Sequence, residues 1–107
     1  MKLSIHQISQ AASGGSYVVI YDAEVRLLNH AQVTVEVDRV EPPETSPDLV
    51  ELARIAIREG AEHVLLPLSQ GAQIQVSKLV INFVDFKPNR FKLFTAIEFE
   101  RIVHAAE

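Results

Sequence analysis

Hydrophobic and polar residues alternate along two segments of the first forty residues. Over residues 32–40, every second position from 33 to 37 is valine and the positions between are polar. This pattern is typical of a strand that buries one face. Residues 17–28 are rich in β-branched and aromatic side chains and predict a second strand. We expect the two to pair as an antiparallel hairpin, and a shorter alternation over residues 2–6 predicts a first strand.

Residues 41–48 stop the preceding strand, because paired prolines cannot donate to its ladder, and a helix is predicted to begin at the end of this segment. Ser46 can cap this helix, and Pro47 suits its first position. Gly60 either ends the helix or lies inside it, and Pro67 is its outer limit. The apolar side chains that keep helical spacing are Leu49, Leu52, Ala53 and Ala56.

The second half of the chain predicts a long strand and a closing helix. The apolar pattern of residues 71–86 shifts phase near Ser77 and Lys78, so we expect a β-bulge there. Residues 94–106 predict a helix. The apolar side chains of its buried face are Ala96, Phe99, Ile102, Val103 and Ala106.

The expected order is strand, strand, strand, helix, strand, helix. Packing the helices on one face of a sheet is the natural way to bury both kinds of apolar surface. We therefore predict a single α+β domain over residues 1–107, with a two-layer, four-stranded sheet and two helices on one face.

Composition narrows the class of protein. The chain has 107 residues, no cysteine and a formal net charge of −4. It therefore has no disulfide, thiolate nucleophile or cysteine-type zinc site, and its acidic balance disfavours general nucleic-acid binding. No apolar run approaches the roughly 20 residues that span a bilayer, and the N-terminus does not resemble a signal peptide. We expect a cytoplasmic protein without membrane partners.

Known catalytic and cofactor motifs do not occur in the chain, so we expect neither enzymatic activity nor a cofactor. The four histidines lack the short spacings of metal ligands, and we expect no metal site. Glu36 with Asp38, and Glu98 with Glu100, could form acid–base pairs, but charged residues in these positions are typical of solvated faces.

Positive charge and aromatic side chains gather only at residues 84–93, "VDFKPNRFKL". Two interpretations stay open. In the first, Lys87, Arg90 and Lys92 neutralise phosphates while Phe86 or Phe91 stacks on unpaired bases, with Lys78 and the Gly14–Gly15 loop nearby. In the second, the two phenylalanines fill the core and the charges stay solvated.

Four stretches resemble, in order, the fourth domain of elongation factor G, the GTPase that drives translocation on the ribosome. "SGGSY" (13–17) is similar to the Ser-Gly-Gly…Tyr stretch before that domain's second strand. "DLVELARIAIREGAEHVL" (48–65) resembles its helix with an Ile-Arg-Glu-Gly run. "LPLSQGAQIQVSKLVINFVD" (66–85) resembles its Gly-Pro-Leu-x-Gly…Val-x-Leu-Val-Asp passage, and "AIEFERIVHAA" (96–106) its last helix.

The resemblance implies the fold of the second domain of ribosomal protein S-five, with a left-handed βαβ crossover against the usual rule. It also implies a domain whose tip reaches transfer RNA and messenger RNA. The family's tip motifs are replaced here by "DRVEPPETSPD" and "KPNRFKLFT", and only Asp85 of its Val-Asp-Gly start survives. We expect a binding domain for RNA or a ribosomal surface; the alternative is a protein-interaction module or homo-oligomer that pairs through the edge of "KLVINFVDF".

Overall fold

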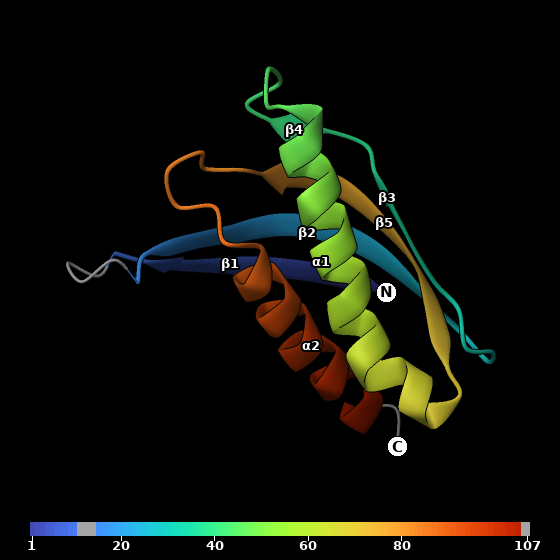
Figure 1. The fold of residues 1–107 in the computed structure, drawn as a ribbon. Coiled ribbons are helices and arrows are strands. Elements are labelled where there is room, and N and C mark those ends of the chain that lie inside the picture. The colour runs from blue at the N-terminus through green and yellow to red at the C-terminus, as the bar shows by residue number, and fades with distance from the viewer. Residues whose placement is uncertain (11–14, 106–107) are drawn as a thin grey trace.

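A computed structural model describes residues 1–10 and 15–105. A twisted sheet forms one layer, and two helices lie together on one of its faces (Figure 1). The strands are β1 (Lys2–Ser9), β2 (Tyr17–Leu28), β3 (Val33–Val37), β4 (Val40–Glu41) and β5 (Gly71–Val80). The helices are α1 (Pro47–Leu65), the short 3-10 helix η1 (Leu66–Leu68) and α2 (Pro88–Ala105). The predicted α+β class is confirmed.

The order of strands across the sheet is β1-β2-β5-β3, and β4 pairs with β5 beyond the end of β3. The predicted strand over residues 32–40 is therefore split into β3 and β4, which follow each other along one side of β5. The sheet has five strands rather than the four predicted, although β4 has only two residues.

The predicted hairpin between residues 17–28 and 32–40 is wrong. β5 lies between β2 and β3, antiparallel to β2 and parallel to β3. The alternating pattern correctly predicts that one face of each strand is buried. It contains no information about which strand is the hydrogen-bonded neighbour. A central β5 also removes the free edge that the homo-oligomer interpretation assigned to "KLVINFVDF".

The connection from β3 through α1 to β5 is a left-handed crossover (Figure 1). With the helices toward the viewer, β3 runs upward, α1 runs downward in front of the sheet, and β5 runs upward on the left of β3. A right-handed unit would place the second strand on the right. This uncommon topology is the one that the resemblance implies.

The start of α1 agrees with the sequence prediction. The Ser46 side chain accepts a hydrogen bond from the Asp48 N–H, and Pro47 occupies the first turn. Gly60 lies inside the helix and does not end it. A Cβ at Gly60 would lie 2.5 Å from the carbonyl oxygen of Lys92, so glycine lets the two helices approach closely.

The predicted bulge in β5 is confirmed, but the strand is shorter than expected. Asp22 pairs with Lys78 and Ala23 with Val76, so Ser77 is the extra residue. β5 ends at Val80, and α2 starts at Pro88 rather than within the 94–106 segment. Residues 88–93, which precede the predicted helix, are the first turns of α2, because proline fixes the backbone angle that a helix needs at its first position.

The core lies between the inner face of the sheet and the helices. Its largest fully buried side chains are Tyr21, Phe91, Phe99, Ile57, Leu65 and Leu79. Leu52, predicted to face inward, is 46% exposed, because the buried face of α1 is centred on Ala53, Ala56 and Ile57. No helix among residues 1–10 and 15–105 is long and apolar enough to cross a membrane.

Candidate binding surface at the tip loop

The segment between β5 and α2, residues 81–87, is called the tip loop below. Its turn is fixed by Asn82, whose side-chain oxygen accepts hydrogen bonds from the N–H groups of Val84 (3.0 Å) and Asp85 (3.2 Å). Asparagine is favoured in turns because its short side chain can replace a backbone acceptor in this way. The turn therefore has a defined conformation that is set by its own sequence.

A second set of contacts ties the tip loop to the start of β2. The Asp85 carboxylate accepts a hydrogen bond from the Ser16 hydroxyl at 2.7 Å, and the Asp85 carbonyl accepts one from the Val18 N–H at 3.2 Å. At the other end of the loop, the Ile81 N–H donates to the Glu41 carbonyl at 2.9 Å, so both ends are anchored to the sheet.

The fixed turn presents two apolar side chains to solvent. Phe83 is 84% exposed and Val84 is 81% exposed, the highest values among the large exposed hydrophobic residues of the described chain. Sequence reasoning missed both residues because it continued the strand to Phe86. Asn82, a turn-forming residue inside the apolar run, is the signal that could have located them.

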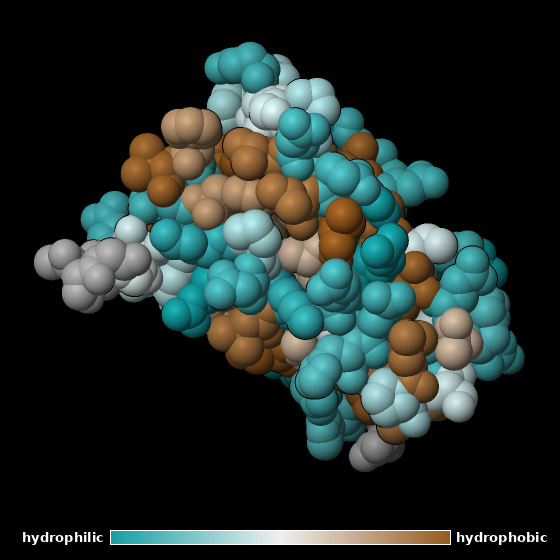
Figure 2. Space-filling model, in the orientation of Figure 1, coloured by the Kyte–Doolittle hydropathy of each residue, from teal (hydrophilic) through white to brown (hydrophobic). Residues whose placement is uncertain are grey.

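A pocket of about 320 Å³ lies beside Phe83. It is lined by Pro42, Glu44, Thr45, Ser46, Leu49, Ile81 and Phe83. The segment on its other side is a turn in which Thr45 donates its N–H (3.0 Å) and its hydroxyl (2.6 Å) to the Pro42 carbonyl. Figure 2 shows apolar surface running from the end of the molecule that holds the tip loop onto the N-terminal half of α1.

The predicted basic cluster is not one patch. Lys78 of β5 lies opposite Asp22 of β2 in the strand register, and its side chain is on the face of the sheet away from the helices. Lys87 is half-buried immediately before α2. The Lys92 ammonium lies 3.6 Å from the Glu59 carboxylate of α1. Because residues two positions apart on a helix point in nearly opposite directions, α2 separates Arg90 from Lys92.

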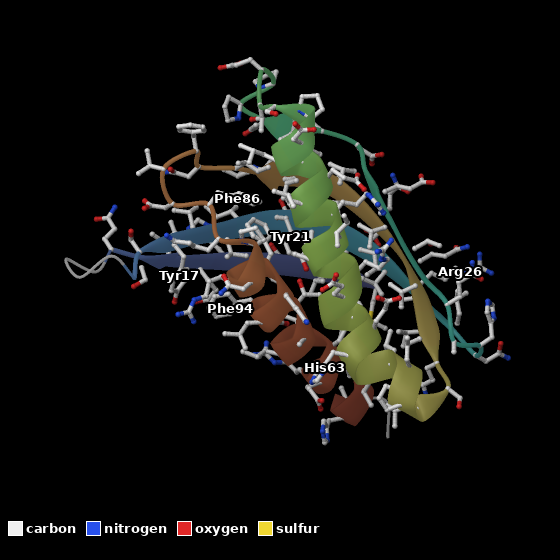
Figure 3. All side chains as sticks on the ribbon, viewed as in Figure 1. Tyr17, Tyr21, Arg26, His63, Phe86 and Phe94 are labelled. Carbon is white, nitrogen blue, oxygen red and sulfur yellow. The ribbon has the colours of Figure 1, made fainter. Side chains whose placement is uncertain are left out.

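Arg90 takes part in an aromatic contact instead. Its guanidinium lies 5.1 Å from the centre of the Tyr17 ring, a cation–π distance. Tyr17 also packs against Phe94, with ring centres 5.4 Å apart, and the two side chains lie side by side in Figure 3. Arg90 is therefore held near the first residue of β2.

The stacking role predicted for Phe91 is wrong, because its side chain is completely buried. The ring stacks on that of Tyr21 with centres 6.3 Å apart. Phe86 is half-buried, packs against the core, and lies 5.5 Å from Phe91 between ring centres. Here the alternative interpretation from the sequence holds, in which the two phenylalanines serve the core. The predicted Gly14–Gly15 site falls partly outside the described residues, since these resume at Gly15.

The buried polar contact beneath this region is structural. The Tyr21 and Thr95 hydroxyls lie 2.6 Å apart and join β2 to α2. Burial raises the pKa of Tyr21 well above its ordinary value, so the phenol stays neutral. Within the described ranges, His, Asp and Glu side chains form no group of three that could hold a metal ion.

The open face of the sheet carries a polar hollow of about 460 Å³. Glu24, Arg26 and Glu36 are among its lining residues. It lies between charged side chains of neighbouring strands and lacks the apolar lining of a typical ligand pocket.

Comparison with known proteins gives a likeness of fold. No protein-family profile matches the chain, and no curated protein matches its sequence. The structure is similar to the crystal structure of ttk003000868 from Thermus thermophilus, with a TM-score of 0.55 and 16% sequence identity. The match covers 94% of this chain and 15% of that chain. At this identity the likeness shows the fold alone, and the present chain corresponds to a small part of the larger protein.

Proposed function

We propose that this chain is a non-enzymatic binding domain that recognises a macromolecular partner through its tip loop. The observation that carries the proposal is the exposure of Phe83 and Val84 on a turn that Asn82 and Asp85 hold in place. Adjacent exposed apolar side chains are typical of interaction sites, and a turn fixed in advance loses little conformational entropy on binding.

The charges around the tip loop favour a protein surface as the direct contact. Acidic residues outnumber basic ones among residues 41–48 and 81–90, where Glu41, Glu44, Asp48 and Asp85 stand against Lys87 and Arg90. Such a balance repels a phosphate backbone, whereas the pocket beside Phe83 suits an apolar side chain. The resemblance to the fourth domain of elongation factor G makes the ribosome the first partner to test.

Direct RNA contact is a second candidate, which Lys87 and Arg90 support. Both lie within a few residues of Phe83, so phosphate contacts and base stacking could combine at one end of the domain. Lys78 on the opposite face and Lys92 beside Glu59 are not included in this proposal.

The test is co-sedimentation with ribosomes and binding to a short single-stranded RNA, at low and moderate salt. The parent is compared with Phe83→Ala/Val84→Ser and with Lys87→Ala/Arg90→Ala, and Lys78→Ala is the control. Protein docking predicts loss of ribosome binding in the first variant, with little dependence on salt. RNA contact predicts loss in the second, with the log–log salt slope falling by about 0.7 for each phosphate contact removed. Parent binding that neither variant weakens would refute the tip-loop proposal.

A further inference from the structure

β1 forms one edge of the sheet, and within residues 1–10 and 15–105 its free side lacks the usual protection. It pairs with β2 in an unbroken register from Lys2 to Ser9. Natural edge strands are usually guarded by shortness, charge, proline or a bulge, because an unpaired edge is a template for another strand. β1 has eight residues, no proline and no bulge, and Lys2 at its first position is its only formally charged side chain.

The opposite edge of the sheet shows the contrast. β3 has five residues and β4 has two, and Asp38 and Arg39 interrupt the edge between them. Pro42 follows directly after β4, and Glu36 adds another charge. One edge of this sheet is thus protected and the other is open.

The alternation of hydrogen-bonded pairs between β1 and β2 identifies the backbone groups of β1 that do not bond to β2. The amino group of Met1 donates to the Val25 carbonyl at 2.8 Å, and the Val25 N–H donates to the Met1 carbonyl at 2.7 Å. Bonded and non-bonded pairs alternate along an antiparallel ladder. The N–H and C=O groups of odd residues in β1 therefore point toward β2, and those of Ser4, His6 and Ile8 point outward.

We propose that β1 is a self-association surface, which pairs with β1 of a second copy in antiparallel fashion across a two-fold axis. The outward groups of Ser4, His6 and Ile8 would form the new ladder, so the chemistry that fits this edge is an extended backbone. Antiparallel pairing about Ile5 places Lys2 of one copy opposite Ile8 of the other. No two like charges then face each other across the seam, which satisfies the main condition on cross-strand pairs.

The neighbouring helix provides a second feature in favour of a copy of this chain. α2 packs against β2 and β1, and its outer surface carries Leu93 (43% exposed) and Ile97 (45% exposed) one turn apart. A two-fold axis perpendicular to the sheet keeps the helices of both copies on the same face. Both copies would therefore share one helical layer, whose outer surface carries these apolar side chains.

A charge swap at one position tests the proposed register. Ile8, which is 50% exposed, is replaced in two variants, Ile8→Lys and Ile8→Glu. In the proposed dimer, position 8 faces Lys2 of the other copy. Ile8→Lys therefore introduces a repulsion across the seam, and Ile8→Glu introduces an attraction. Sedimentation-velocity dissociation constants should differ between the variants by on the order of tenfold, because the two-fold axis counts each pair twice. Circular dichroism verifies that both variants are folded.

Amide hydrogen exchange in the parent gives an independent readout. Leu3, Ile5 and Gln7 should be protected at every concentration, while Ser4, His6 and Ile8 become protected only as the mass rises to that of a dimer. A constant monomer mass at the highest soluble concentration would overturn the proposal. The proposal would also be overturned if the chain associates while the amides of Ser4, His6 and Ile8 still exchange fast and the two Ile8 variants have equal dissociation constants. Because the tip loop is unchanged in these variants, the result does not depend on the function proposed above.

Discussion

The hydroxyl groups of Tyr21 and Thr95 lie 2.6 Å apart in the core, and each satisfies the other. Both side chains are fully buried, and no other hydrogen bond joins a side chain of β2 to one of α2 in the described chain. This contact is a polar link between β2 and α2 inside an apolar layer, and it helps to set where α2 lies on the sheet.

Thr95→Val should lower the free energy of unfolding by about 1–3 kcal/mol, because it leaves the Tyr21 hydroxyl buried without a partner. Adding Tyr21→Phe removes that unsatisfied group, so the double variant should recover part of the loss. Urea denaturation of the parent, both single variants and the double variant measures this coupling. Strictly additive losses would show that the two hydroxyls do not act as a pair.

Alkaline pH should destabilise the protein through Tyr21. Its pKa in the folded state is raised by burial, above the ordinary tyrosine value of about 10. The unfolded state therefore loses its proton first. Stability is fully present below pH about 10 and falls as the pH rises toward the folded pKa, by up to about 1.4 kcal/mol per pH unit. Urea midpoints between pH about 8 and about 11 should fall less steeply for Tyr21→Phe than for the parent. Parallel curves would contradict the assignment.

Gly60→Ala should destabilise the protein even though alanine is the better helix former by about 1 kcal/mol. The added methyl group would lie 2.5 Å from the Lys92 carbonyl oxygen and 2.9 Å from Cβ of Thr95, so the helices must separate. We expect a net loss of about 1–2 kcal/mol in thermal or urea unfolding. Glu59→Ala is the control, since it removes only a surface ion pair and should cost under about 1 kcal/mol.

Truncation to alanine should cost much stability at one phenylalanine and almost none at another eight positions away. Phe91→Ala empties a fully buried site and should cost about 3–5 kcal/mol of unfolding free energy. Phe83→Ala, at an 84% exposed position, should change stability by less than about 0.5 kcal/mol. Urea unfolding of the two variants checks this, and a large loss for Phe83→Ala would place its ring in the core.

Local chemistry in the sequence was sufficient for several elements. Ser46 followed by Pro47 marks the start of α1 because a capping side chain and a proline act on their immediate neighbours. The strand over residues 17–28 was predicted with its observed bounds, since its β-branched and aromatic content is a property of the segment itself. The phase shift at Ser77 likewise located the bulge, because inserting one residue inverts an alternating pattern.

The tertiary structure decided which segments lie together. The partner of β3 is β5, and neither alternating pattern contains that choice, since a strand with one buried face fits beside many others. Phe91 is buried because α2 starts at Pro88 and turns that residue toward Tyr21. The same helix directs Arg90 and Lys92 to different sides, which divides a cluster that is continuous in the sequence. Burial and proximity depend on contacts between distant segments. The sequence by itself therefore determined the type and order of the main elements, and packing determined several of their bounds and the surface that they form.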